Sequence, residues 1–217
     1  CFYLDRAKGL KEPGMPGWSL NSAVDELLKK EFDILRKQKK PHPIFKKNKL
    51  NFIPFQHEKM DQWRNSLKGG ISYFDKNTNV ELYGGLDDIW FNNDKEELVV
   101  VDYKAQSSNE KVETESYLSN IYHQGYKIQM DIYVYILRKM DFKVSDVSYF
   151  YVCNGEKSYD KFEGKLNFTT TLVPYKTDTS WVDKKIIEMK KVLESSKIPE
   201  INKSCEHCAY LEGGKRF

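Results

Sequence analysis

Hydrophobic and polar positions alternate along the chain in patterns that predict a mixed set of helices and strands. Apolar residues at three- and four-residue spacings predict helices over residues 22–37, 117–140 and 181–196, with a shorter helix over 57–67. Short apolar runs bounded by turn residues predict strands over 71–75, 79–85, 86–91, 97–105, 147–153 and 165–175. This order predicts a single α/β domain spanning residues 1–217.

One predicted strand ends in two opposite charges. The apolar run Leu98 to Val101 leads directly into Asp102, and Lys104 follows two positions later. An acid two residues before a lysine is weak evidence by itself, because the pattern occurs five times, starting at Asp102, Asp141, Glu163, Asp183 and Glu188. The occurrence at Asp102 differs from the others because it follows an unbroken apolar run, where an uncompensated charge is costly to bury.

A hairpin would bring a second acid to Asp102. If residues 93–96 form the turn, Asn92 faces Glu97 and Asp87 faces Asp102, about 5 Å apart. Two carboxylates at that distance repel one another unless a cation lies between them, which favours a divalent metal. Lys104 lies on the same face by the two-residue period of a strand. A register slip of one residue would replace Asp87 with Asp88, and an Asp–Lys pair at a frayed strand end is the simpler alternative.

The long predicted helix carries a polar and aromatic stripe. Tyr122, Tyr126, Gln129 and Tyr133 fall within about 60° of one another at 100° per residue. Such a stripe could contact a nucleic-acid strand by stacking and hydrogen bonding. The alternative is a helix that packs its tyrosine rings into the core.

Charge and composition narrow the class of protein. The 217 residues balance to a formal net charge of +3, so affinity for nucleic acid would have to come from a local patch. The segment 36–49 carries seven cations and no acid, and it is either a solvated loop or a guide for a phosphate backbone. No apolar run is long enough to cross a bilayer, and no signal peptide opens the chain, so we expect a cytoplasmic protein without a membrane partner. A first residue other than Met suggests that a segment precedes Cys1.

Three motifs in order resemble the RecB-like branch of the PD-(D/E)XK nuclease superfamily. They are GGLDDI from residue 84, VVVDYK from residue 99 and QMDIY from residue 129. The matching positions are Gly84, Asp87, Asp102, Lys104, Gln129 and Tyr133. The resemblance covers most of the chain. It implies a restriction-endonuclease-like core, in which a mixed β-sheet is flanked by helices in a single domain.

The resemblance also implies roles for these residues. Asp87, Asp102 and the main-chain carbonyl of Tyr103 would bind Mg²⁺ or Mn²⁺, and Lys104 would orient and help deprotonate the attacking water. Gln129 and Tyr133 would support the lysine or a substrate phosphate. On the first helix, Asp25 stands where the family often has a histidine ligand, which is a departure from the pattern but a hard oxygen donor suited to Mg²⁺. An acid at the edge of the core is the alternative for this position.

The cysteines resemble those of RecB-like nucleases that join their termini through an iron–sulfur cluster. Cys205 and Cys208 near the end, with Cys1 at the start, would connect residues 1–10 and 203–217. The family places three cysteines at its C-terminal end and this chain has two, so the fourth ligand could be Cys153 or a cysteine upstream. Cys153 also suits a buried strand thiol, and His207 is a weak substitute ligand. Four thiolates do not distinguish a [4Fe–4S] cluster from Zn²⁺.

The resemblance implies a metal-dependent DNA nuclease that hydrolyses phosphodiester bonds. We expect an exonuclease on single-stranded or frayed ends, with a possible protein partner in a repair or CRISPR-type complex. The alternative from another class is a non-catalytic DNA-binding module that keeps the nuclease fold. A structural zinc protein with an incidental acid pair is a third, weaker interpretation of the sequence.

Overall fold

A computed structural model describes residues 2–10, 19–202 and 204–214. The chain divides into two compact units, each described separately below. The sheet unit comprises Trp18–Asp75 and Glu81–Ser180. The terminal unit comprises Cys1–Gly17, Lys76–Val80 and Trp181–Phe217.

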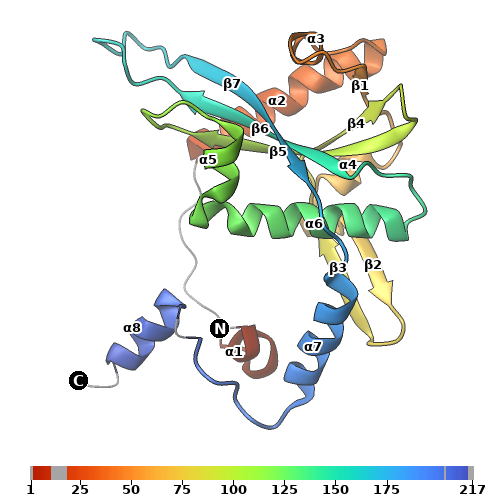
Figure 1. The fold of residues 1–217 in the computed structure, drawn as a ribbon, viewed down its shortest axis with the longest axis vertical. Coiled ribbons are helices and arrows are strands. Elements are labelled where there is room, and N and C mark those ends of the chain that lie inside the picture. The colour runs from red at the N-terminus through yellow and green to blue at the C-terminus, as the bar shows by residue number, and fades with distance from the viewer. Residues whose placement is uncertain (1, 11–18, 203, 215–217) are drawn as a thin grey trace. The chain divides into compact units, whose positions relative to one another are not determined.

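The sheet unit is built on five strands in the order β1-β4-β5-β6-β7 (Figure 1). Their bounds are Phe52–Pro54 for β1, Asp88–Asn92 for β4, Glu97–Gln106 for β5, Val147–Gly155 for β6 and Phe168–Lys176 for β7. Strands β5 and β6 run parallel, and the other neighbours are antiparallel. The parallel pair requires a crossover, which the chain makes through helices between the two strands. The predicted mixed sheet flanked by helices is confirmed.

Helix α2 (Ser19–Gln38) packs an apolar face against one side of the sheet. Leu28 and Phe32 on this helix lie in one cluster with Trp90 and Val99 from β4 and β5, and the Phe32 and Trp90 rings stack with centroids 5.4 Å apart. The sequence pattern predicted this helix to within three residues at either end. The shorter helices α3 (Pro43–Lys47), α4 (Met60–Trp63) and the 3-10 turn η1 (Ser66–Lys68) follow it in the chain.

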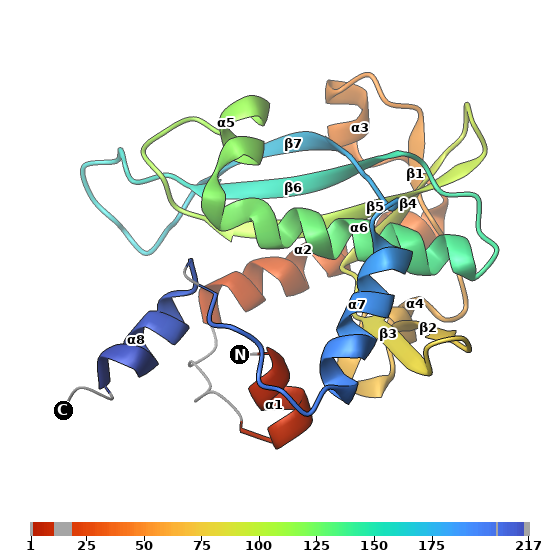
Figure 2. The ribbon, with the colours of Figure 1, turned by 60° about the horizontal axis from the view of Figure 1, so that its bottom comes forward.

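Helices α5 (Thr114–Ser119) and α6 (Gln124–Lys139) form the crossover and cover the other side of the sheet (Figure 2). Tyr117 of α5 packs against Phe150 of β6, with ring centroids 5.8 Å apart. Phe150 is the register partner of Asp102 in the parallel ladder, so α5 lies beside the part of β5 that carries the acid.

The predicted continuous helix over 117–140 is wrong at Asn120. This residue has an extended backbone (φ −60°, ψ 127°), and its side chain accepts the main-chain N–H of Tyr122, which starts a separate 3-10 turn η2 (Ile121–His123). An Asn side chain offers the backbone this alternative to a helical hydrogen bond. Tyr122 therefore lies outside α6 and is 82% exposed, so the predicted stripe loses its first member.

A separate hairpin of β2 (Ile71–Asp75) and β3 (Val80–Gly84) forms a two-stranded sheet. Its two ends meet so closely that a Cβ on Gly70 would lie 2.1 Å from the carbonyl oxygen of Gly84, and Gly70 has a left-handed φ of 56°. Position 70 therefore requires glycine. The predicted helix over 57–67 is shorter than expected and reduces to α4 with η1.

The terminal unit contains α1 (Phe2–Lys8), α7 (Val182–Glu194) and α8 (Glu206–Gly214). The Tyr3 hydroxyl donates to the main-chain oxygen of Ser195 at 3.2 Å, so the N-terminal helix contacts the end of α7. Among the described residues, no helix has the length and apolar character needed to span a membrane.

Candidate active site

The β4–β5 hairpin has the register that the sequence predicted. Asn92 pairs with Glu97 and Asp88 with Val101, which places Asp87 opposite Asp102 one position beyond the last pair of the ladder. The Asp87 carboxylate accepts the main-chain N–H of Tyr103 at 2.8 Å. This bond holds the acid against β5, which continues to Gln106, so Asp87 and Asp102 come together at one site within the strand.

Asp88 points to the opposite side and has a different role. Its fully buried carboxylate accepts the Tyr103 hydroxyl at 2.8 Å and a guanidinium N–H of Arg64 at 3.0 Å, and it also pairs with Arg36. Asp33 of α2 pairs with the same two arginines. We call Asp33, Arg36, Arg64 and Asp88 the arginine cluster. The structure therefore assigns the facing position to Asp87 and excludes the slipped register.

The arginine cluster also supports the turn that carries Asp87. Arg64 donates from Nε to the main-chain oxygen of Asp87 at 3.0 Å while its other nitrogens bind Asp33 and Asp88. Burial raises the pKa of Tyr103 well above its ordinary value, with a further contribution from Asp88, so this hydroxyl stays protonated and donates. One buried network thus fixes the main chain on both sides of the acid pair.

Lys104 lies beside Asp102 as predicted. Its ammonium forms an ion pair with the Asp102 carboxylate and lies 4.4 Å from the centre of the Tyr126 ring. The Tyr126 ring stacks in turn on His123, with centroids 5.3 Å apart. A cation over an aromatic face is attracted by the ring quadrupole, so Tyr126 helps to position the amine.

Burial raises the pKa of both acids, and the neighbouring lysines oppose that rise. Burial raises the pKa of Asp102 to about 7; Lys104 opposes the rise and the neighbouring Asp87 adds to it. Burial also raises the pKa of Asp87, against the opposing charge of Lys29. Carboxylates with raised pKa values in a shared site favour a cation, because the cation stabilises the charged forms that burial disfavours.

Lys29 was not singled out from the sequence, and it lies within the acidic site. Its ammonium is 2.7 Å from a carboxylate oxygen of Asp25 and 3.5 Å from one of Asp87. Asp25 thus reaches the neighbourhood of the acid pair, as the resemblance implied, but its carboxylate is paired with a lysine four residues further along α2. The predicted metal role of Asp25 stays a prediction.

Gln129 and Tyr133 brace the chain that leads to Asp87. The Gln129 side chain donates to the Tyr133 hydroxyl at 2.7 Å, and that hydroxyl donates to the main-chain oxygen of Gly85 at 2.7 Å. A Cβ on Gly84 would lie 2.6 Å from the Tyr133 ring, so only glycine permits this approach. The two helix residues act on the acidic site through the turn at Gly84 and Gly85.

The donor set suits a hard divalent cation. Asp87, Asp102 and the Tyr103 carbonyl offer oxygen ligands, which Mg²⁺ and Mn²⁺ prefer. The Oδ2 atom of Asp102 is buried and accepts no well-formed hydrogen bond among the described residues, although the Lys104 ammonium is its ion-pair partner. Within 2–10, 19–202 and 204–214, no three His, Cys, Asp or Glu side chains are grouped as metal ligands. Instead, the carboxylates form ion pairs with the ammonium groups of Lys29 and Lys104.

Tyr117 adds a second buried polar atom near the acids. Its hydroxyl has no hydrogen-bond partner among the described side chains and main-chain groups, and burial raises its pKa, with Asp102 contributing. The sequence analysis did not single out this residue, which was only the first position of the helix predicted over 117–140.

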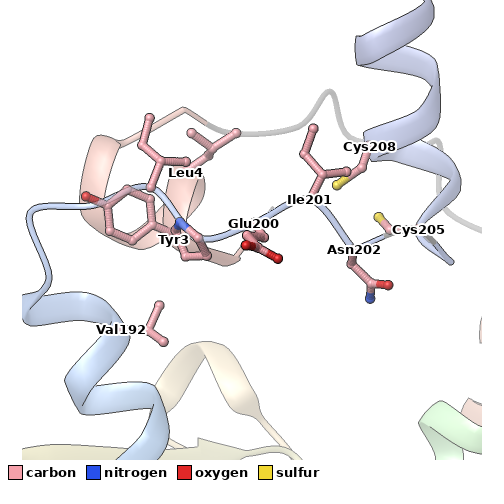
Figure 3. A pocket seen from close by; sticks show the side chains of 10 residues that line it. Tyr3, Leu4, Val192, Glu200, Ile201, Asn202, Cys205 and Cys208 are labelled. Atoms are coloured by element: carbon pink, nitrogen blue, oxygen red, sulfur yellow. The ribbon is translucent and has the colours of Figure 1, made fainter.

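The described cysteines fall into two places. Cys153 is buried in β6 among apolar side chains, and burial raises the pKa of its thiol to about 11, as expected for a strand thiol. Cys205 and Cys208 line a cavity of about 400 Å³ in the terminal unit, with Tyr3 and Ile201 among its other residues (Figure 3). The main-chain N–H and the thiol of Cys208 lower the pKa of Cys205. Cys1 lies outside the described residues, so the terminal metal site stays a prediction.

The basic segment 36–49 needs one correction. Arg36 is buried and paired with Asp33 and Asp88, so it is unavailable to a phosphate backbone. The other six cations are exposed, namely Lys37, Lys39, Lys40, Lys46, Lys47 and Lys49. The exposed lysines at the end of α2 and along α3 are called the α3 basic patch below.

The fold and the acid–lysine site together define a class of phosphodiester-cleaving proteins. Residues 8–212 match the family model for the PD-(D/E)XK nuclease superfamily. The chain therefore belongs to this superfamily. No curated protein matches it. A crystal structure of a Eubacterium rectale protein, provisionally assigned as an exonuclease, is similar at 16% identity and a TM-score of 0.43, covering 96% of this chain and 85% of that one.

Proposed function

We propose that this nuclease is a divalent-cation-dependent deoxyribonuclease that acts as an exonuclease on single-stranded or frayed DNA ends. The observation that supports it is the convergence of Asp87, Asp102 and Lys104 at the end of the hairpin. Membership of the nuclease superfamily supports the reaction class, and the metal, the DNA preference and the exonuclease mode belong to the proposal.

In this proposal Asp87, Asp102 and the Tyr103 carbonyl hold Mg²⁺ or Mn²⁺. A bound divalent ion would polarise a phosphate oxygen and lower the pKa of a water molecule. Lys104 supplies a second positive charge beside Asp102, where it can orient the attacking water and stabilise charge that develops on the phosphate. Tyr126 keeps the amine in place, and Gln129 and Tyr133 keep the Asp87 turn in place.

A lysine replacement tests the mechanism. We expect Lys104→Ala to reduce cleavage at least about 100-fold, because removing one group that stabilises charge developing in the transition state has an effect of that order. DNA affinity should change less than about threefold, since one of many cations is removed. The measurement is cleavage of an end-labelled oligonucleotide in Mn²⁺, with binding followed by fluorescence anisotropy in Ca²⁺.

The matched control is Lys143→Ala, which removes the lysine of another acid-x-Lys tripeptide. Lys143 is exposed and donates to the main-chain oxygen of Lys95, away from the acid pair. Full activity of Lys104→Ala would remove this lysine from the mechanism. If the wild-type chain binds DNA but does not cut it in either metal, the non-catalytic DNA-binding alternative replaces the proposal.

A circular substrate tests the mode of action. An exonuclease should degrade linear single-stranded DNA and leave a circular single strand of the same sequence intact. Cutting of the circle would make the protein an endonuclease. The role of a protein partner in a repair or CRISPR-type complex is a further expectation from the sequence.

The cysteines enter no step of this mechanism. Cys205 and Cys208 are two described thiols in the terminal unit, fewer than the four ligands of a structural zinc site or a [4Fe–4S] cluster. An anaerobic absorption spectrum with metal analysis tests the terminal site independently of cleavage.

A further inference from the structure

Lys29 connects two acids that come from different elements. Asp25 lies one turn earlier on α2, and Asp87 precedes β4, 58 residues further along the chain than Lys29. The lysine ammonium contacts both carboxylates, at 2.7 and 3.5 Å. A single positive charge therefore lies between two of the three carboxylates of the site.

The neighbouring residue shows that helix spacing alone does not produce this arrangement. Lys30 pairs with Glu26 at the same four-residue spacing, but both side chains are about two-thirds exposed, at 65% and 67%. The Lys29 side chain is 22% exposed, and its second partner belongs to the hairpin. Lys30–Glu26 is an ordinary surface pair that adds little, whereas Lys29 belongs to the acidic site.

The charges of the site leave room for one divalent cation. Asp25, Asp87 and Asp102 contribute three negative charges, and Lys29 and Lys104 contribute two positive ones. Three minus two leaves a formal charge of −1, which one divalent ion converts to +1. Two-metal sites hold their ions about 3.5–4 Å apart, so a second ion would need a carboxylate adjacent to the first. Asp25 with Asp87 offers that place, and the Lys29 ammonium lies there.

We propose that Lys29 takes the position of a second metal ion, so that the site binds one divalent cation between Asp87 and Asp102. Asp25 then serves as the counter-ion of Lys29. The lysine supplies a fixed positive charge beside Asp87, as Lys104 does beside Asp102. This inference rests on the proposed metal-dependent function and adds the number of ions and the group that replaces the second one.

The test is a direct count of bound Mn²⁺ on the full chain, using the electron paramagnetic resonance signal of the free ion. Wild-type protein should bind one ion. Lys29→Met keeps the length of the side chain without its charge, and it should bind two. The matched control Lys30→Met, one residue away, should bind one.

Asp25→Asn gives a second measurement that does not depend on the folding of the Lys29 variant. If Asp25 is a counter-ion, this variant should still bind one Mn²⁺ ion, at lower affinity because the formal charge of the site rises from −1 to 0 and Lys29 is left with Asp87 alone. Loss of the bound ion at saturating Mn²⁺ would make Asp25 a metal ligand and overturn the inference.

The number of ions bound to the wild-type protein tests the role of Lys29 separately from the metal-dependent function. Two ions bound to the wild-type chain would overturn the role of Lys29 and leave the metal-dependent nuclease intact. No bound ion would overturn the metal-dependent function and the Lys29 inference with it. One ion bound to a folded Lys29→Met variant would also overturn the Lys29 inference.

Discussion

Adjacent residues in this protein have unrelated roles because a strand directs successive side chains to opposite faces. Asp87 lies in the acidic site with Asp102, while Asp88 lies in the arginine cluster behind it. The sequence motif GGLDDI contains both acids and does not by itself say which one faces Asp102. The hairpin register decides it.

Replacing each acid by its amide should separate these roles. Asp88→Asn leaves Arg36 and Arg64 buried with one fewer charged partner, so we expect the free energy of unfolding to fall by about 3 kcal/mol. Asp87→Asn retains an oxygen that can accept the Tyr103 N–H, so its loss should stay below about 1 kcal/mol. Urea denaturation in a chelator measures both values.

The effects on activity should not follow the effects on stability. Asp87→Asn should be folded and inactive, because it removes a proposed metal ligand. Equal destabilisation by the two replacements would contradict the assignment of Asp88 to the arginine cluster.

At the scale of elements, the contact between α6 and the end of β3 controls the turn before Asp87. Gly84→Ala would place a methyl group 2.6 Å from the Tyr133 ring, so the ring must move from its bond to Gly85. We expect the free energy of unfolding to fall by about 1–3 kcal/mol, the usual cost of overpacking. Cleavage should fall as well, because Asp87 follows three residues later. Thermal unfolding and the cleavage assay measure the two effects.

Gly125→Ala on the same helix α6 is the matched control. An added Cβ there meets no atom within 4 Å, and alanine favours a helix by up to about 1 kcal/mol over glycine. Equal effects of the two replacements would mean that the approach of Tyr133 to Gly84 does not constrain the turn.

The sequence predicted most of the elements, and the failures have identifiable causes. The unbroken apolar run Leu98 to Val101 and the turn at residues 93–96 were enough for β5 and its register with β4, because both signals are local. The break at Asn120 was missed because its capping bond competes with a helical pattern that otherwise continues. The contacts of Lys29 with Asp87 and of Arg64 with Asp88 could not be predicted from local sequence patterns, because the partners lie 58 and 24 residues away along the chain.

The sequence predicted which residues form the site better than it predicted the contacts among them. Asp87, Asp102 and Lys104 were found from the motif and the strand period, and the structure brings them together. Gln129 was expected to steady the lysine or a phosphate, whereas it donates to Tyr133, and Tyr126 is the residue that contacts the lysine. The stripe predicted the correct face of the helix but not which of its residues contacts the lysine.

At the scale of the whole molecule, a net charge of +3 makes the distribution of lysines more informative than their number. The α3 basic patch gathers exposed cations in a short segment, and residues 36–49 include no acid to balance them. A single strand that binds such a patch releases counterions, which makes its affinity dependent on salt.

Replacing two lysines of the patch should reduce that dependence. For Lys46→Gln with Lys47→Gln, we expect the slope of log affinity against log salt to become shallower by about 1.4, because each phosphate neutralised on single-stranded DNA accounts for about 0.7. Anisotropy titrations of a labelled oligonucleotide between about 50 and 200 mM salt measure it at the concentrations where the effect is large.

The control is Lys184→Gln with Lys185→Gln on α7. Lys185 pairs with Glu188 on the exposed face of that helix, so the slope should not change. An unchanged slope after replacement at positions 46 and 47 would show that the patch is a solvated surface.

The arginine cluster has a consequence for how loss-of-function variants are interpreted. It shares the main chain of Asp87 and Tyr103 with the acidic site, although its own side chains lie on the far side of the strand. An inherited or selected change at Asp33 or Arg64 could therefore silence the enzyme without altering any group that meets the scissile bond. Inactivating substitutions should therefore fall on both faces of the sheet, and those on the side of the arginine cluster would act through the backbone that holds Asp87.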